Sequence, residues 1–259
     1  MGLLEGKKGL ILGVANERSI AWHIARNIAA HGGVCGFSHL PGEKMEKRVR
    51  RTLASGGMQD AWLFPCDASD DADLDRLFSA WSESFGSLDF LVHSIAFADR
   101  EYLKDGMFVE TPRDVFAQAM DISAYTLVAV ARRARDLMPE GGSIITLSYY
   151  GAEKAMPGYN VMGVAKSALE SAARYLAADL GPAGIRVNSL SAGPCRTLSA
   201  MAVGGLDTIL DRVEESAPLR RNIETDEVGK AAVYLLSDLS SGITGETHHV
   251  DSGYNAVAI

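Results

Sequence analysis

The sequence has few cysteines, and their arrangement excludes a disulfide framework. Only three occur among 259 residues: Cys35, Cys66 and Cys195. An odd, scattered set without metal-ligand spacing is typical of reduced thiols, and two of the three fall in expected strands. The adjacent His248 and His249 do not predict a metal site, because neighbouring residues of a strand point to opposite faces. We therefore expect no metal site.

The sequence also lacks an apolar run of membrane-spanning length and an excess of basic residues. No segment approaches the ~20 apolar residues of a transmembrane helix, and residues 1–8 lack the apolar region of a signal peptide. The 25 Lys and Arg residues against 33 Asp and Glu residues give a net charge of −8, which argues against a nucleic-acid partner. Arg132, Arg133 and Arg135 are then expected on the solvated face of a helix. These absences predict a cytoplasmic protein that binds neither membranes nor nucleic acids.

No linker, repeat or low-complexity tract divides the chain, so residues 1–259 are expected to form one domain around one large core. Short apolar segments alternate with helical patterns along the whole sequence. This alternation is typical of an α/β fold with a doubly wound, Rossmann-type parallel sheet and helices on both faces. Seven strands are expected, at residues 9–14, 33–38, 61–66, 88–93, 142–148, 185–190 and 246–250.

Small or polar residues follow most of the expected strands, among them Gly13, Asp67, Ser94 and Ser148. Ligands of this architecture bind at the carboxyl edge of the sheet, so these residues should converge on one crevice. The first strand leads through Gly13 into a helical pattern with Ser19 near its start, an arrangement that can bind phosphate at a helix N-terminus. The dinucleotide pattern is incomplete, because Ala15 and Ser19 stand where glycine is usual, and an ordinary structural turn remains possible.

Tyr149, Tyr159 and Lys166 form the most informative pattern. If a helix begins near Pro157, Tyr159 and Lys166 lie two turns apart on one face. An ammonium about 4 Å from a phenol, at an effective dielectric near 20, favours the phenolate by at most ~4 kcal/mol, or roughly three pKa units. This predicts a lowered pKa for Tyr159, which could then donate a hydrogen bond or proton near neutral pH. The alternative is a packed tyrosine and a solvated lysine that share the spacing by chance.

Several stretches together resemble the short-chain dehydrogenase/reductase superfamily over essentially the whole chain, and within it the bacterial enoyl-[acyl-carrier-protein] reductases of type II fatty-acid synthesis. Most members of the superfamily place lysine four residues after the catalytic tyrosine, where this chain has Gly163; the seven-residue step from Tyr159 to Lys166 is that of the enoyl reductases. The matching stretches are residues 13–21, 93–98, 121–125, 147–166 and 186–198.

The resemblance implies that hydride from a bound nicotinamide reaches the β-carbon of a trans-2-enoyl thioester on acyl carrier protein. Tyr159 would then donate to the enolate oxygen, and Lys166 would hold the nicotinamide ribose. Tyr149 would line the acyl pocket or assist the enolate, unless it is only a packing aromatic. The implied cofactor contacts are Gly13, Ser19, Ile20, Leu40, Asp67, Ala68, Ser94, Ile95, Lys166, Gly193, Cys195 and Thr197. Of these, Asp67 and Ala68 would flank the adenine, Ile95 the adenosine side and Thr197 the pyrophosphate; the implied substrate contacts are Phe97, Ala98 and Met162.

The end of the second strand, residues 38–41, lacks both the carboxylate common in NAD enzymes and the arginine common in NADP enzymes. Because family members with a neutral strand end still use NADH, we expect NADH rather than NADPH. Lys44, Lys47 and Arg48 could meet a 2′-phosphate, but their mixed-charge helix favours a solvated face.

The family's basic residues that meet an acidic carrier are absent at positions 204, 205, 207 and 208. Only Arg212, Arg220 and Arg221 remain nearby, so carrier docking needs a local patch. The apolar, glycine-bearing run at 200–205 suits a substrate lid at about 195–215, or an ordinary connection. Superfamily members with a seventh strand and a short tail, here residues 250–259, usually bury this segment between subunits, so the resemblance implies a homotetramer.

Two alternatives to an enoyl reductase stay open. One is a related reductase or dehydrogenase that acts on another enone or on a carbonyl, and the other is a catalytically idle dinucleotide sensor. An idle relative should have lost the tyrosine or the lysine, whereas this chain keeps Tyr149, Tyr159 and Lys166 together.

Overall fold

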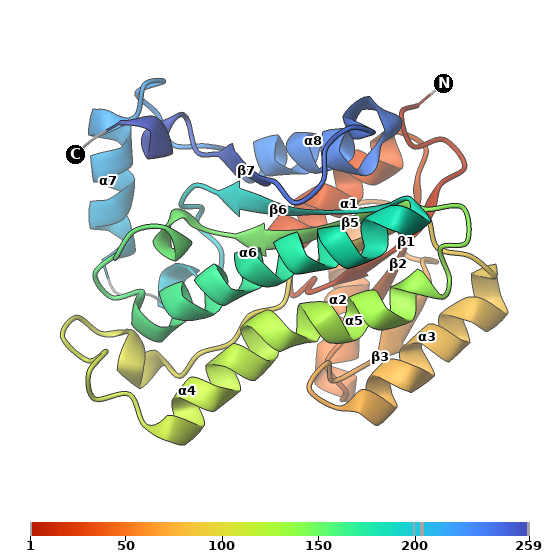
Figure 1. The fold of residues 1–259 in the computed structure, drawn as a ribbon, viewed down its shortest axis with the longest axis horizontal. Helices are drawn as coiled ribbons and strands as arrows, with labels where there is room; N and C mark the ends of the chain where they lie inside the picture. Colours follow the sequence, from red (N-terminus) through yellow and green to blue (C-terminus); the bar gives the residue numbers. More distant parts are fainter. Residues whose placement is uncertain (1, 199, 203–204, 258–259) are drawn as a thin grey trace.

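The computed structural model describes residues 2–198, 200–202 and 205–257. Its seven strands form one parallel sheet in the order β3-β2-β1-β4-β5-β6-β7 (Figure 1), as expected for a doubly wound fold. The strands are β1 Lys8–Leu12, β2 Val34–His39, β3 Leu63–Pro65, β4 Phe90–His93, β5 Gly142–Ser148, β6 Ile185–Ala192 and β7 Thr247–Val250. The main helices are α1 Ile20–Ala30, α2 Glu43–Ser55, α3 Asp71–Phe85, α4 Arg113–Met120, α5 Thr126–Arg135, α6 Asn160–Leu180, α7 Leu206–Ser216 and α8 Thr225–Leu236.

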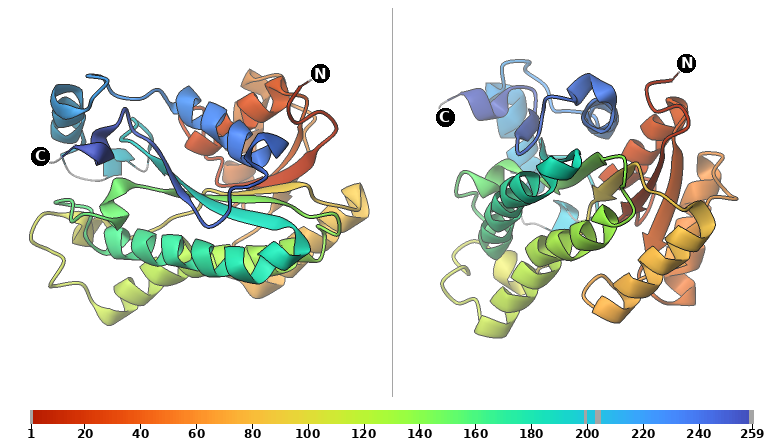
Figure 2. Two further views of the ribbon diagram at one scale, coloured as in Figure 1. Left: turned by 45° about the horizontal axis from the view of Figure 1, so that its top comes forward. Right: turned by 45° about the vertical axis from the view of Figure 1, so that its right-hand side comes forward.

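Apolar side chains are buried on both faces of the sheet, because helices cover each face. α1, α2 and α8 contribute to one core cluster, and α3, α5 and α6 contribute to the other. Figure 2 shows α8 on one side of the sheet and α5 and α6 on the other. Near-continuous apolar runs such as that of β1 are what a strand buried on both faces requires. Because helices cover both faces of the sheet, its carboxyl edge is where a ligand can bind.

Some strand boundaries differ from those expected. β3 is limited to three residues, so Cys66 follows the strand and Cys35 alone of the three cysteines lies within one. All three thiols are free and buried, which agrees with the expected reduced state. β6 continues to Ala192 because its last four residues pair with β7. No helix within the described residues is long and apolar enough to cross a membrane.

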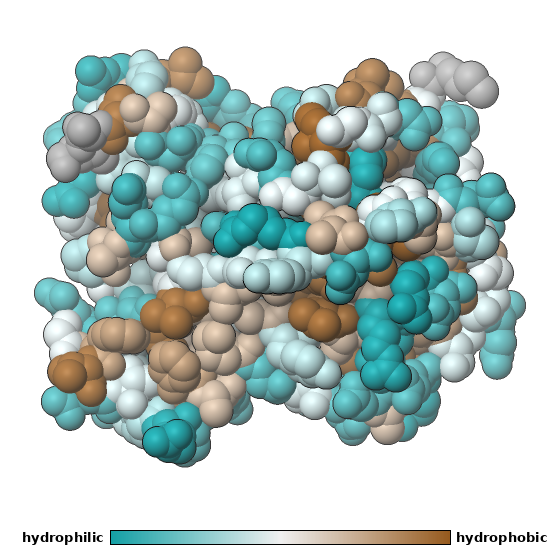
Figure 3. Space-filling model, viewed as in Figure 1, coloured by the Kyte–Doolittle hydropathy of each residue, from teal (hydrophilic) through white to brown (hydrophobic). Residues whose placement is uncertain are grey.

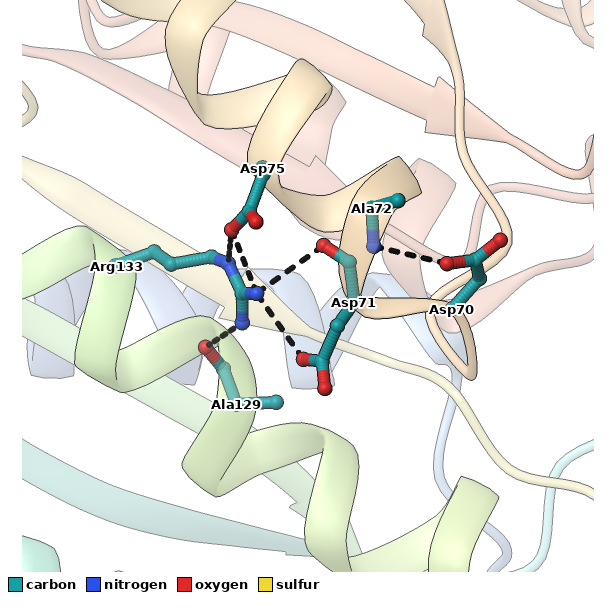
Figure 4. A network of polar contacts seen from close by, with 6 residues as sticks. All are labelled: Asp70, Asp71, Ala72, Asp75, Ala129 and Arg133. Atoms are coloured by element: carbon teal, nitrogen blue, oxygen red, sulfur yellow. Dashed lines mark hydrogen bonds and ion pairs between the residues drawn. The ribbon is translucent and has the colours of Figure 1, made fainter.

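The prediction that Arg133 lies on a solvated face is wrong. Arg132 and Arg135 are exposed, but the Arg133 side chain is only 13% exposed and joins α5 to α3 (Figure 4). Its guanidinium donates to Asp75 Oδ1 at 2.7 Å and to Asp71 Oδ1 at 3.0 Å. Two carboxylates at the start of α3 therefore neutralise Arg133, an arrangement that helical periodicity alone could not reveal.

A π-helical turn at Asp121–Tyr125 interrupts the long helix formed by α4 and α5. The Ser123 hydroxyl accepts from Phe97 N at 2.9 Å and donates to Phe97 O at 3.0 Å. The turn also places Thr126 Oγ1 2.8 Å from Nε2 of the buried His93. Such turns are frequent at functional sites, and this one fixes the loop that follows β4.

Candidate active site

Gly13 lies where the loops after β1 and β4 meet. Its φ is +108°, and a Cβ there would lie 2.0 Å from Ser94 O. Only glycine fits, because both the backbone angle and the neighbouring carbonyl exclude a side chain. The sequence analysis predicted that glycine at this position lets the backbone approach a phosphate. In the structure, the group that a side chain at residue 13 would meet is the backbone carbonyl of Ser94.

Ser19 organises the turn between β1 and α1. Its Oγ accepts hydrogen bonds from Ala15 N and Asn16 N, both at 3.0 Å, and Ile20 then opens α1. Ser19 therefore does not cap its own helix through its side chain, but it orders the loop in place of the missing glycines. The N-terminus of α1 faces the carboxyl edge of β1, where its free N–H groups can hold a phosphate.

The expected adenosine contacts lie at the ends of β2 and β3, which are neighbours in the sheet. Leu40 is exposed, and its carbonyl lies 2.8 Å from Nδ1 of the buried His39. Asp67 accepts from Ser69 N at 3.0 Å, so part of its carboxylate is used within its own loop. Ala68 is buried beside it. Residues 40–42, which connect β2 to α2, include no acidic residue.

The loop after β4 brings together part of the expected substrate site. Ala98, Met162 and Tyr159 pack in one apolar cluster with the buried Leu103. Phe97 does not belong to that cluster, and its side chain is 45% exposed. Ser94 and Ile95 lie in the same loop, which Ser123 fixes through the Phe97 backbone. Ser123 lies in one of the stretches that resemble the enoyl reductases, but the sequence analysis assigned it no function. Its hydrogen-bond partner, Phe97, is set by the π-helical turn and could not be found from the sequence.

Tyr149 and Tyr159 face each other at the carboxyl edge of β5. Their ring centroids are 5.0 Å apart with an interplanar angle of 75°. Tyr159 is the N-cap residue of α6, so the helix begins at Asn160 rather than near Pro157 as expected. Gly151 makes room for it, since a Cβ there would lie 2.5 Å from Tyr159 Cδ1.

Lys166 is buried and is not the solvated lysine of the alternative interpretation. It is 7% exposed, and its Nζ donates to Leu147 O at 2.6 Å. Burial lowers the pKa of Lys166 to about 8, although Glu170 raises it. An ammonium has three donor hydrogens, and within the described residues Leu147 O accepts one of them, so the others can bind a ligand.

The predicted pKa of Tyr159 is wrong in direction. Burial raises the pKa of the Tyr159 phenol, and Tyr149 and Glu170 raise it further. Burial also raises the pKa of Tyr149 to about 12. The sequence argument placed the ammonium against the phenol, whereas Lys166 is directed to Leu147 O and desolvation of the phenol dominates. Tyr159 therefore holds its proton at neutral pH and can donate it.

The segment after β6 holds the last group of expected cofactor contacts. Gly193 N donates to Val250 O at 2.7 Å, and Thr197 Oγ1 accepts from Ala200 N at 3.0 Å. The Cys195 side chain packs in the core, and burial raises its pKa to about 11. Its thiol is thus turned away from the sheet edge, and only its backbone could contact a cofactor.

Polar groups elsewhere on the chain concern the other residues named in the sequence analysis. The three arginines near the expected lid, Arg212, Arg220 and Arg221, are all exposed. Arg221 forms a two-pronged ion pair with Glu227, and Arg220 donates to Glu215 O. Lys47 pairs with Glu43 on the exposed side of α2. The structure holds no group of three or more His, Cys, Asp or Glu side chains fit for a metal ion within the described ranges. Residues 199, 203 and 204 of the expected lid lie outside those ranges.

Comparison with known proteins identifies the family. The model for "Enoyl-(Acyl carrier protein) reductase" matches residues 13–255. "Enoyl-[acyl-carrier-protein] reductase [NADH] 1" of Rhizobium meliloti is 53% identical over 258 residues, 100% of this chain and 93% of that protein. An [NADPH] enzyme of the same name from Staphylococcus aureus (strain MRSA252) is 49% identical over 254 residues, 98% of each chain.

Solved structures agree with this assignment. The Bacillus cereus enoyl-acyl carrier protein reductase with NADP+ and indole naphthyridinone superimposes with a TM-score of 0.96 at 49% identity, covering 100% of both chains. The Anaplasma phagocytophilum enzyme in complex with NAD gives 0.94 at 49% identity, covering 100% of this chain and 97% of that one. The chain therefore belongs to the enoyl-(acyl-carrier-protein) reductase family.

Proposed function

We propose that this protein reduces the 2,3 double bond of trans-2-enoyl thioesters with NADH, as a step of fatty-acid synthesis. The observation that carries the proposal is the placement of two facing tyrosines and a buried ammonium at the carboxyl edge of the sheet. Relatives about 50% identical over the full chain are named as NADH-dependent enoyl-[acyl-carrier-protein] reductases.

The residues present fit a dinucleotide. The turn after Gly13 and the N-terminus of α1 offer backbone donors for a pyrophosphate. Lys166 has donor hydrogens beyond the one that Leu147 O accepts, and these suit the hydroxyls of a nicotinamide ribose. The cofactor supplies a hydride when bound. Lys166 holds and orients it, and its charge keeps the site positive.

Tyr159 stabilises the charge that develops on the substrate. Hydride addition at the β-carbon moves an electron pair toward the thioester oxygen, and the enolate then takes a proton at the α-carbon. A neutral phenol in a desolvated site is a strong hydrogen-bond donor to that oxygen, and burial keeps Tyr159 protonated. Tyr149 is in edge contact with Tyr159, whose ring packs with Ala98 and Met162. Tyr149 thus fixes the ring of Tyr159 and lines the acyl side of the site.

NADH is the preferred cofactor, with NADPH less favoured. Most of the relatives described as enoyl reductases are NADH enzymes, and the Staphylococcus aureus enzymes are NADPH-dependent. This chain has neither an acid nor an arginine directly after β2. Without the repulsion of an acid, a 2′-phosphate is tolerated, so discrimination between the two cofactors should be modest.

We further propose a cytoplasmic homotetramer that takes its thioester from acyl carrier protein, with residues 195–215 covering the acyl chain. β7 forms one edge of the sheet, and apolar side chains are exposed on the face that carries α5 and α6, including Tyr125, Val164 and Tyr175. Figure 3 shows apolar surface on this face. Association would cover it.

The function is tested by following NADH and NADPH oxidation with crotonyl thioesters of acyl carrier protein and of coenzyme A. We expect NADH oxidation with both, faster with the carrier-bound substrate. Oxidation that requires a carbonyl substrate would support a different reductase. Cofactor binding without turnover on any enone would support a sensor.

A further inference from the structure

Side chains on one face of α6 form hydrogen bonds to the segment from Leu147 to Ala152, which contains Tyr149. Gly163, Lys166, Ser167 and Glu170 follow the spacing that aligns residues along one side of a helix. Lys166 Nζ donates to Leu147 O at 2.6 Å. One turn later, the carboxylate of Glu170 accepts a hydrogen bond from Ser148 Oγ.

The same face of α6 also contacts Gly151 and Ala152, which follow Tyr149. Ser167 Oγ donates to Ala152 O. A Cβ at Gly163 would lie 2.7 Å from Gly151 O, so helix and chain are in direct contact there. Tyr149 is thus held between two anchored neighbours, with the Glu170 to Ser148 bond immediately before it.

Glu170 is a buried carboxyl group that the proposed reaction does not use. Residue 170 is 6% exposed, as is Ser148. Burial raises the pKa of Glu170, and Glu153 raises it as well; the bond from Ser148, His249 of β7 and Arg174 of α6 act in the opposite sense. His249 in turn lies 2.7 Å from Glu153.

Lys166 is the buried cation on this face. A lone ammonium in such a place is costly unless an opposite charge lies near it. Glu170 is one helical turn away on the same side of α6 and is the charged group that raises the pKa of Lys166 against burial. The two side chains also hold adjacent residues of β5, Leu147 and Ser148.

We propose that Glu170 is a positioning residue with two separable effects: its hydrogen bond to Ser148 fixes the end of β5 and hence Tyr149, and its negative charge balances the buried ammonium of Lys166. The inference rests on the proposed function, because it assumes that Lys166 holds the cofactor and that Tyr149 serves the substrate. Glu170 itself would contact neither the cofactor nor the substrate.

Two substitutions separate the effects. Glu170→Gln keeps an oxygen that can accept from Ser148 but removes the charge. Ser148→Ala keeps the charge but removes the donor. Asp179→Asn removes one negative charge from an exposed position of the same helix and serves as the matched control.

The first experiment measures NADH binding by cofactor fluorescence across pH. Lys166 has a pKa of about 8, and its protonated form binds, so wild-type affinity should fall as pH rises through that value. Without Glu170's charge the ammonium loses its proton more readily, and the fall should move to lower pH by about one unit in Glu170→Gln. Ser148→Ala and Asp179→Asn should keep the wild-type profile. An unmoved profile in Glu170→Gln would overturn the charge effect.

The second experiment measures kcat with a crotonyl thioester. Ser148→Ala should lower kcat by about tenfold at unchanged NADH affinity, because Tyr149 loses its anchor. Full kcat in this variant would overturn the hydrogen-bond effect. If Glu170→Gln fails to fold, Glu170→Asp should show lower kcat with an unmoved NADH profile, since it keeps the charge on a shorter side chain; a moved profile would contradict the proposal.

The binding experiment uses no enoyl substrate, which separates the two proposals. A wild-type protein that does not reduce enoyl thioesters would refute the proposed function. The pH profile of NADH binding would still decide whether Glu170 balances Lys166.

Discussion

The two sides of the proposed site are held in different ways. At the β5 and α6 side, Lys166, Ser148 and Glu170 are buried; Lys166 donates to Leu147 O, and Ser148 donates to Glu170. At the side that follows β6, the ion pair between Arg196 and Asp207 is exposed, with side chains 65% and 79% accessible. Leu198 and Met201 are exposed as well.

This difference separates chemistry from access. Groups that stabilise a transition state act best when the fold already fixes them, and the tyrosines and lysine meet that condition. An exposed ion pair contributes only ~0–1 kcal/mol, so the described part of the segment after β6 can rearrange at low cost. A site that must admit and release an acyl chain needs such a side.

The largest loss of activity should come from replacing Tyr159 or Lys166, the reactive groups on the β5 and α6 side. Tyr159→Phe should lower kcat by about 10²–10⁴-fold while NADH affinity is kept, because the phenol acts on the substrate. Lys166→Ala should also weaken NADH binding, by about tenfold or more, because it removes a charged donor. Fluorescence titration and steady-state kinetics on both variants test this. Equal NADH affinity in the two would contradict the division of roles.

A methyl group placed between α6 and the chain at Gly151 should also disturb the fixed side. Gly163→Ala should cost about 1–3 kcal/mol of unfolding free energy through overpacking and lower kcat by displacing Tyr159. Gly181→Ala is the matched control, because a Cβ there meets nothing within 4 Å and its φ is −54°. It should be neutral or slightly stabilising. Urea unfolding of both variants decides, and equal stabilities would count against the tight contact.

His93 should make the buried side sensitive to acid. Burial, and then Lys166, lower its pKa to about 3, and its ring nitrogens meet Thr146 and Thr126. Because Thr126 donates its one hydroxyl proton to Ile122 O, it accepts from Nε2–H, and Nδ1 accepts from Thr146.

The unfolded state binds a proton at His93 below pH ~6.5, whereas the folded state does not until about pH 3. The stability that depends on neutral His93 is therefore present above pH ~6.5 and is lost progressively as pH falls, by about 2 kcal/mol at pH 5. Urea unfolding at pH 7 and pH 5 should show this loss, and His93→Gln should show a smaller one. An equal loss in both proteins would assign the acid sensitivity to other groups.

The smallest effect should come from charge at the open side. Arg212→Glu should raise the KM for a carrier-bound thioester by no more than about fivefold, because an exposed pair contributes ~0.2–1 kcal/mol, and the KM for a coenzyme A thioester should hardly change. Salt should weaken carrier docking only gently. Arg51→Glu, exposed on α2, is the control. A tenfold loss or a steep salt dependence would reveal a strong basic patch.

The sheet and the convergence of the site could be predicted from the sequence, because strand and helix periodicity survive in every segment and parallel strands share a carboxyl edge. The helix that carries Lys166, with Tyr159 at its N-cap, followed from the spacing of the two residues. Burial did not, and it reversed the expected pKa of Tyr159. The spacing could not show that Lys166 turns to Leu147.

Contacts between distant segments account for the other misses. Arg133 is neutralised by a helix that begins 62 residues earlier. The π-helical turn carries Ser123, whose hydrogen-bond partner Phe97 lies 26 residues earlier in the chain. Glu170 follows Lys166 by four residues, but the sequence analysis gave it no role. Its hydrogen-bond partner, Ser148, lies 22 residues away in the sequence.

The most direct test of the account is to locate the transferred atoms. Crotonyl thioester should be reduced with NADH that carries deuterium at the transferable position, and the product analysed by mass spectrometry and NMR. The account predicts one deuterium at the β-carbon, and one at the α-carbon when unlabelled NADH is used in D₂O. Deuterium from NADH at the thioester carbonyl carbon, or no transfer to crotonyl thioester while a ketone is reduced, would contradict it.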